Sequence, residues 1–179
     1  YIRYQEQLER GSRLRRRVEQ LNQIFELGQI LQSSAEPVSV LESILDGIQE
    51  SVSFEVGVAV LTDDRDGLLR RAAQTGMPLD AFERSRASTA TLDNVKALLR
   101  DEYRVSESYF IPAEARGALP SDALGLLNTA FEGRRQLPNA ADERGWRDGD
   151  LLLLPLVGAG GNILGVMSLD RPADNLRPE

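Results

Sequence analysis

The sequence predicts an α+β fold with helices on one face of a central antiparallel sheet of about five to six strands. Two pairs of short apolar segments, each joined by turn-forming residues, indicate two β-hairpins. A helical pattern precedes the first pair. Residues 113–149 form a long connection rich in Gly, Pro and charged residues, which we expect to cross the other face of the sheet.

The first part of the chain, residues 1–33, predicts one long helix ahead of the domain. Its apolar residues recur at the 4-3-4 spacing of a heptad seam: Leu14, Val18, Leu21 and Phe25. We expect a homodimer through these four residues, in a coiled-coil arm separate from a domain over residues 34–179. The alternative is a surface helix folded against its own domain, and Gly11 and Gly28, which fall on the same seam, leave it open.

A second helix is expected to begin at Pro37, because proline suits the first helical turn. Its apolar side chains share one face: Val38, Leu41, Ile44, Leu45, Ile48 and Val52. Such a helix packs on a broad apolar surface, and the strands that follow supply one. They are predicted over residues 56–62 and 68–74, joined by an acidic turn at residues 63–67.

The remaining elements are shorter. In chain order they are a helix over residues 79–84, a helix capped by Thr91, a third strand over residues 103–111, a helix over residues 121–131, and a closing hairpin with strands over residues 151–157 and 163–169. This order of helices, hairpin, strand, crossing segment and hairpin is typical of one α+β domain.

The absence of two residue types restricts the chemistry of this chain, which contains no Cys and no His. Without Cys there is no disulfide, thiolate catalysis or zinc–sulfur site. Without His, a serine-type triad lacks its usual base and haem lacks its commonest axial ligand. We therefore expect neither enzymatic activity nor a cofactor or metal, with a carboxylate- or metal-dependent enzyme as the minor alternative.

The charge of the chain argues against a nucleic-acid partner. The net charge is −7, and residues 1–33 carry +2, from six Arg and four Glu, so the remainder carries −9. An acidic domain offers no clustered cationic face for phosphates. No apolar run approaches the ~20 residues that span a bilayer, and the chain starts at Tyr1, inside a helical pattern. We expect a cytoplasmic fragment of a longer protein, with no direct membrane span.

The two hairpins resemble those of a known family. Residues 146–157 (WRDGDLLLLPLV), a glycine turn and residues 163–172 (ILGVMSLDRP) resemble the closing hairpin of GAF domains in bacterial multi-sensor histidine kinases and diguanylate cyclases. Residues 57–61 and 68–76 are similar to the opening hairpin of that family, and residues 108–112 to another of its strands. The resemblance implies a GAF-like fold. A PAS domain is the alternative, and the two helices ahead of the first strand favour GAF.

The resemblance also implies a regulatory sensory domain of a bacterial two-component signalling protein. Such a domain would bind an unknown small molecule or partner under residues 112–149 and transmit the signal through helical linkers. The alternative is a ligand-free dimerisation or spacer module between sensor domains. The Cys that attaches bilin in some relatives is absent, as is the pattern of those that bind cyclic nucleotides. The family's closing helix would begin near Leu176, so we expect it to be truncated here.

Four residues are candidates for contact with a ligand: Arg104, Tyr109, Ile111 and Trp146. Tyr109 and Ile111 alternate with Phe110 along the third strand, so they share one face of the sheet. Trp146, the only tryptophan, precedes the closing hairpin and would close an aromatic wall over a small ligand. The alternative for these aromatic and apolar residues is core packing, which we favour for Trp146.

Arginines in or beside the crossing segment are candidates for binding carboxylate or phosphate groups: Arg104, Arg116, Arg134 and Arg135. For each of them a solvated surface charge is the favoured alternative. Asp170, just before Arg171 and Pro172, is expected to fix the exit of the last strand rather than to bind a ligand.

Overall fold

The structure is a computed structural model that describes residues 36–51, 54–137 and 142–178. The predicted arm over residues 1–33, with its seam of Leu14, Val18, Leu21 and Phe25, lies outside the described residues, as does Val52. The coiled-coil homodimer therefore stays a prediction.

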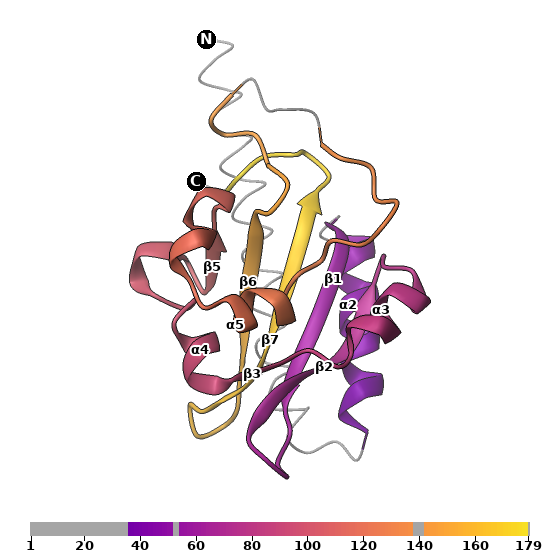
Figure 1. Ribbon diagram of the computed structural model, residues 1–179, viewed down its shortest axis with the longest axis vertical. Helices are drawn as coiled ribbons and strands as arrows, with labels where there is room; N and C mark the ends of the chain where they lie inside the picture. Colours follow the sequence, from indigo (N-terminus) through magenta and orange to yellow (C-terminus); the bar gives the residue numbers. More distant parts are fainter. Residues whose placement is uncertain (1–35, 52–53, 138–141, 179) are drawn as a thin grey trace.

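A single antiparallel sheet of seven strands forms the centre of the domain, in the order β3-β2-β1-β7-β6-β5-β4 (Figure 1). The strands are β1 Phe54–Thr62, β2 Leu68–Thr75, β3 Thr89–Thr91, β4 Arg104–Val105, β5 Ser108–Ile111, β6 Leu151–Val157 and β7 Ile163–Pro172. The two predicted hairpins, β1–β2 and β6–β7, are confirmed, and they join through β1 and β7 at the middle of the sheet. The sequence therefore predicted the α+β class and the antiparallel sheet.

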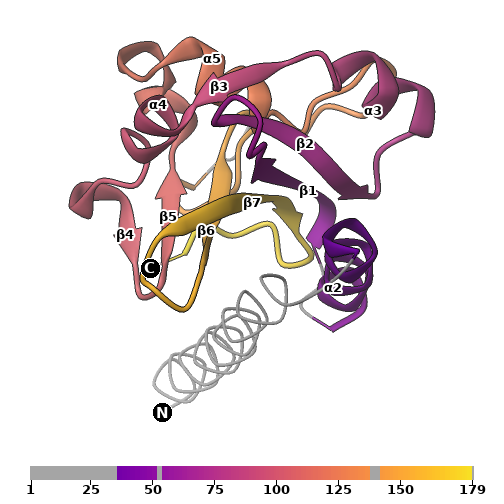
Figure 2. The same ribbon diagram turned by 90° about the horizontal axis from the view of Figure 1, so that it is seen from below.

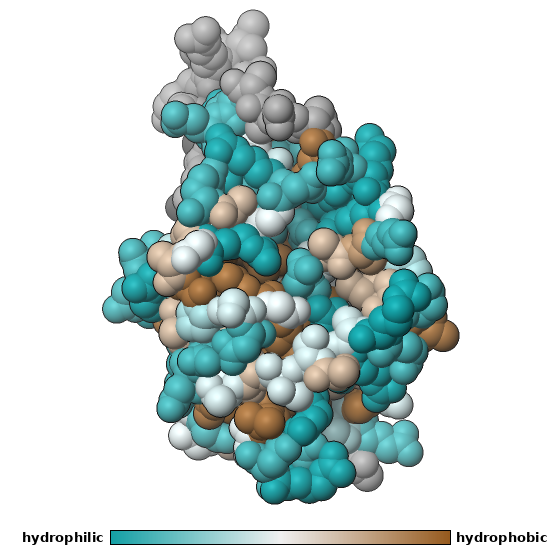
Figure 3. Space-filling model, viewed as in Figure 1, coloured by the Kyte–Doolittle hydropathy of each residue, from teal (hydrophilic) through white to brown (hydrophobic). Residues whose placement is uncertain are grey.

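Helices lie on both faces of the sheet. The α-helices are α2 Pro37–Ser51, α3 Leu79–Ser85, α4 Leu92–Lys96 and α5 Ser121–Leu126, and the 3₁₀ helices are η1 Asp101–Tyr103 and η2 Ala113–Ala118. Helix α2 lies on one face, whereas α3, α4 and α5 lie on the other (Figure 2). The sequence assigned the second face to the crossing segment, and the structure adds these short helices to it. Polar residues on the surface of that face surround a less polar centre (Figure 3).

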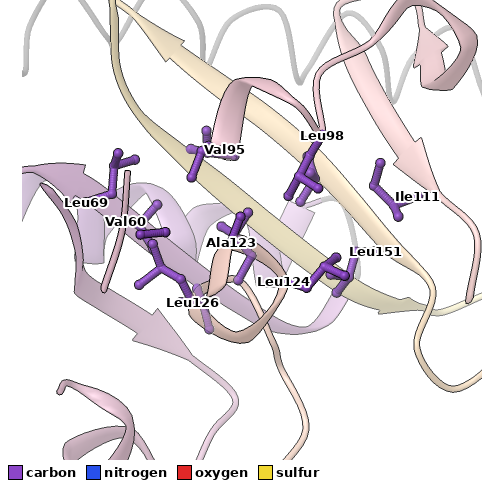
Figure 4. Close-up of a cluster of buried hydrophobic side chains, with 14 of the residues drawn as sticks. Val60, Leu69, Val95, Leu98, Ile111, Ala123, Leu124, Leu126 and Leu151 are labelled. Carbon is purple, nitrogen blue, oxygen red and sulfur yellow. The ribbon is translucent and has the colours of Figure 1, made fainter. Parts of the chain in front are cut away.

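The sheet separates two hydrophobic clusters, and strand β6 shows how one strand serves both. Leu151 and Leu153 belong to the cluster on the α4–α5 side (Figure 4), whereas Leu152, Leu154 and Leu156 belong to the cluster on the α2 side. Because successive side chains of a strand point to opposite faces, a strand covered on both faces becomes a nearly continuous apolar run. This geometry explains the sequence LLLLPLV of β6.

Helix α2 packs as its amphipathic pattern predicts. It begins at Pro37, and its buried side chains form a single face: Leu41, Ile44, Leu45 and Ile48. Val38, which was predicted to share this face, is 42% exposed. It belongs to the first turn of the helix, ahead of the buried positions.

The predicted third strand over residues 103–111 is broken. The backbone turns at Ser106, whose φ of 58° is left-handed, so that β4 folds back and pairs with β5. Two side-chain bonds stabilise the turn: the Ser108 hydroxyl donates to the Val105 carbonyl (2.8 Å) and Arg104 Nε donates to the Ser106 carbonyl (3.0 Å). A polar turn between two apolar strand pieces is not visible in the alternation of residues alone.

Two further differences concern short elements. The predicted helix over residues 121–131 ends at Leu126, and after it Asn128 Oδ1 accepts the N–H of Ala130 (3.2 Å) in a local turn. Strand β3, which the sequence did not predict, pairs with β2 and leads straight into α4. The predicted cap of α4 is confirmed, because Thr91 Oγ1 accepts the N–H of Asn94 (3.2 Å).

Replacing Gly76 tests how closely the chain turns after β2. Its φ is +74°, and a Cβ atom would lie 1.9 Å from the backbone oxygen of Glu55. We expect Gly76→Ala to lower the free energy of unfolding by at least ~2 kcal/mol, from backbone strain plus the clash. Gly47 on the exposed side of α2 has free space around it, so the control Gly47→Ala should raise stability by about 0.5–1 kcal/mol. Urea denaturation measures the stability of both variants. Equal effects would contradict the conclusion that Gly76 occupies a crowded, left-handed turn.

Candidate functional site

A pocket of about 280 Å³ lies where strand β6 begins and strand β7 ends. The crossing segment supplies one side of it, with residues 128–131, Arg134 and Gln136. Leu151 of β6 and Asp170 and Arg171 of β7 supply another. The pocket thus lies under the 112–149 segment, where the sequence predicts a ligand.

Asp170 is the central polar group of this region, and it is only 4% exposed. Its Oδ1 accepts the indole N–H of Trp146 (2.7 Å). Its Oδ2 accepts the hydroxyl of Thr129 (2.5 Å) and a guanidinium N–H of Arg134 (2.8 Å). One buried carboxylate therefore ties the end of β7 to the crossing segment and to the loop before β6. The expected role of Asp170 at the strand exit fits these bonds.

Arg134 is buried, with a side chain 8% exposed. Its Nη1 donates to Asp170 and to the carbonyl of Thr129 (3.1 Å), and its guanidinium lies 5.7 Å from the ring centre of Phe131. Its Nε and Nη2 are buried and have no hydrogen-bond partner. The solvated surface charge that the sequence favours for Arg134 is therefore wrong.

Arg171, next to Asp170 on β7, is also buried, with a side chain 3% exposed. Its Nη2 donates to Asp148 (2.9 Å), its Nη1 lies 3.6 Å from a carboxylate oxygen of Glu55, and its buried Nε has no partner. The backbone φ of Arg171 is 58°, which is uncommon for a residue with a side chain. Strained backbone of this kind is concentrated at functional sites.

Arg116 is the third arginine in the lining of the pocket, and it is half-buried. Its Nη1 donates to the carbonyl of Gly149 (2.9 Å). Burial lowers the pKa of Arg116, and the nearby charge of Asp170 partly opposes this shift. The lining of the pocket therefore holds three arginines against two carboxylates, Asp148 and Asp170.

A second buried carboxylate, Asp150, stands beside the pocket and is fully buried. It accepts the backbone N–H groups of Ala113 and Arg147 (2.8 Å each) and two N–H groups of Arg177 (2.8 Å each). The hydrogen bonds that Arg177 donates to Asp150 raise the pKa of Arg177. The chain that follows β7 is thus anchored to the start of β6.

The structure does not bring the four predicted ligand residues together. Trp146 is 3% exposed and packs on the α2 side of the sheet, with Phe54 and Phe110 at 6.4 and 5.6 Å between ring centres. Tyr109 and Ile111 belong to the cluster on the opposite side, and Arg104 is exposed beside Glu107. None of the four lines the pocket.

Sequence reasoning missed Asp170, Arg171 and Thr129 as members of a site. The available signal was a carboxylate inside a largely apolar final strand, since buried carboxylates need partners.

In the ranges 36–51, 54–137 and 142–178, no three His, Cys, Asp or Glu residues are grouped so that they could hold a metal ion. Within that same part of the chain, no helix has both the length and the apolar character needed to cross a membrane.

Replacing the central carboxylate tests the network. Asp170→Asn keeps the shape but leaves the buried guanidinium of Arg134 without its counter-charge, so we expect a loss of about 3–5 kcal/mol in the free energy of unfolding. The control is Asp80→Asn, which breaks an exposed ion pair with Arg84 and should cost less than about 0.5 kcal/mol. Chemical denaturation measures both, and a small effect of Asp170→Asn would contradict the assigned role.

No protein-family model and no curated protein matches the sequence. Solved structures do match. The GAF domain/HD domain protein from Geobacter sulfurreducens has a TM-score of 0.50 and 17% identity, over 79% of this chain and 78% of that one. The GAF domain from Acinetobacter phosphoenolpyruvate-protein phosphotransferase has a TM-score of 0.49 and 14% identity, over 96% and 80% of the two chains. The fold of this chain is therefore that of GAF domains.

Proposed function

We propose that this domain is a regulatory sensor in a bacterial signal-transduction protein of the two-component histidine kinase type. It binds a small molecule in the pocket between β6, β7 and the crossing segment, and it acts in the cytoplasm. Its role is regulatory rather than catalytic, and the parent protein is a histidine kinase or a diguanylate cyclase. The observation that carries the proposal is a pocket with buried N–H donors in its wall that have no partner.

Unpartnered donors in the lining are the feature of this pocket that points to a ligand. Each buried polar group without a partner costs about 1–3 kcal/mol. Two neighbouring arginines in one lining, Arg134 and Arg171, carry three such atoms. A ligand with acceptor groups would recover part of that free energy once a guanidinium turns toward the pocket. The volume of about 280 Å³ lies just below the usual range for ligand sites, ~300–1,000 Å³, and suits a small ligand.

The hydrogen bonds around Asp170 connect the pocket to the opposite face of the sheet. Arg134 in the pocket lining shares the carboxylate of Asp170 with Trp146. Trp146 packs against Phe54, at the start of β1, on the side covered by α2. A ligand that moves Arg134 would therefore change the packing near α2, and a coupling of about 1–3 kcal/mol is enough for a useful signal.

The helical linkers complete the proposal. Residues 1–33 precede α2 in the chain, so a shift of α2 would reach the predicted arm directly. In this proposal the arm forms a homodimer through Leu14, Val18, Leu21 and Phe25, and it carries the signal to the output module.

Native mass spectrometry tests whether the pocket is used. We expect the protein, incubated with a low-molecular-weight bacterial extract, to retain a small molecule that is released on denaturation. Ala130→Trp, which places a large ring at an exposed position of the pocket lining, should abolish the retained mass. Ala87→Trp, at an exposed position outside the lining, should preserve it.

Two other outcomes of that experiment are decisive. A protein that retains nothing would contradict the sensor proposal and favour the alternative, a ligand-free dimerisation or spacer module. Retention that survives Ala130→Trp would place the ligand elsewhere in the molecule.

A further inference from the structure

The pocket also indicates the chemical class of its ligand, an inference that rests on the proposed sensor function. We infer that the ligand is a small organic anion. Its carboxylate or phosphate group is bound by Arg116, Arg134 and Arg171, and its apolar part lies against Phe131 and Leu151.

The unpartnered groups in the wall are all donors. They are Nε and Nη2 of Arg134 and Nε of Arg171. A guanidinium has five N–H donors and no acceptor, so only an acceptor on the ligand can satisfy it. Carboxylate and phosphate oxygens are the strongest such acceptors, because they match the guanidinium in both charge and geometry.

The charges of the lining lead to the same conclusion. Asp170 is already paired with Arg134, and Asp148 with Arg171. Within the described part of the chain, Arg116 has a neutral carbonyl partner, Gly149, and no ion pair. Its half-buried charge is offset only in part, by the nearby charge of Asp170, and it would gain more from an anion than from a neutral ligand. A cationic ligand would instead have to displace an arginine from a carboxylate.

The apolar part of the lining requires more than a bare ion. Phe131, Ala130 and Leu151 line the pocket together with the arginines. Apolar and aromatic surface beside a few polar groups is typical of sites for small organic molecules. An organic anion can bind the arginines and also contact the apolar part of the lining, whereas inorganic phosphate can bind only the arginines.

The bound anion would turn the guanidinium of Arg134 while Arg134 stays beside Asp170. Its free Nε and Nη2 are enclosed by protein atoms, so the guanidinium must turn before a ligand can reach them. That turn changes the bond between Arg134 and Asp170, and Asp170 also accepts the N–H of Trp146. Trp146 is the only tryptophan of the chain. Its fluorescence therefore reports binding at the arginines.

The direct test compares ligands of different charge by isothermal titration calorimetry and Trp146 fluorescence. The probes are benzoate, succinate, phenyl phosphate and inorganic phosphate, with neutral benzamide and cationic benzylamine as controls. We expect at least one organic anion to bind and to shift the emission of Trp146. Its neutral or cationic counterpart should bind at least tenfold more weakly, because it leaves the guanidinium donors without a charged acceptor.

Substitutions identify the group that binds. Arg134→Lys keeps a cation opposite Asp170 but removes Nε and one Nη, so we expect anion affinity to fall at least tenfold. The matched control Arg135→Lys changes an exposed neighbour outside the lining and should leave the affinity within twofold. If Arg134→Lys fails to fold, Arg116→Gln provides the same comparison, because Arg116 is only half-buried and should also lose at least tenfold.

The outcomes separate this inference from the sensor proposal. Retention of a neutral or cationic molecule from the extract, with no binding of any anion probe, would overturn the inference and leave the sensor proposal standing. Anion binding that both Arg134→Lys and Arg116→Gln leave unchanged would also overturn it. If the extract and every probe leave the protein unoccupied, both proposals fail.

Discussion

The buried carboxylate of Asp170 is the group on which the arrangement of this domain depends. It lies near the end of the central strand β7 and accepts bonds from Trp146, Thr129 and Arg134. These partners belong to parts of the chain that no strand pairing holds to β7. Because an unpaired carboxylate could not remain buried, the three partners and Asp170 require one another. These bonds help to fix the crossing segment on the sheet, together with the hydrogen bonds that Ser168 and Arg71 donate to its backbone, and residues of this segment line the pocket.

Asp150 is a second buried carboxylate that joins separate segments of the chain at this end of the sheet. Asp150 fastens Arg177, which follows β7, to the start of β6, and it also holds the backbone of Ala113 at the start of η2. Gly149 and Leu151, its two neighbours in sequence, line the pocket. The pocket therefore lies between two polar anchors, which hold the backbone around it near one geometry before any ligand arrives, although the guanidinium of Arg134 still has to turn. Such pre-organisation reduces the entropy cost of binding.

Periodicity made most of the fold predictable. Helix α2 and the two hairpins have regular patterns of apolar residues, and the α+β sheet was predicted from them. The break between β4 and β5 was not predictable, because it depends on a left-handed Ser106 and on two side-chain bonds within a single turn. The pocket was even harder to predict from the sequence. Arg134 looks like a surface residue in a charged segment, and its partner Asp170 is 36 residues away in sequence. Local sequence patterns indicate which face of an element is buried. They do not indicate which charged residue, far away in the sequence, becomes the partner of a given side chain.

The cost of burying Arg134 is the strongest physical reason to regard the pocket as a working site. A domain selected only for stability would place a smaller or apolar side chain there, since replacing buried ion pairs by apolar groups is often neutral or stabilising. Here the ion pair is retained, two donors of its arginine stay unpartnered, and Arg171 beside it adopts a strained backbone. The unpartnered donors and the strained backbone each lower stability, the ion pair adds little over an apolar pair, and all three features occur in the lining of one pocket. A ligand that accepts from these arginines would offset part of that cost. In the proposed sensor, ligand binding would change the interactions of Asp170. Because Asp170 also accepts the N–H of Trp146, that change would reach the α2 side of the sheet.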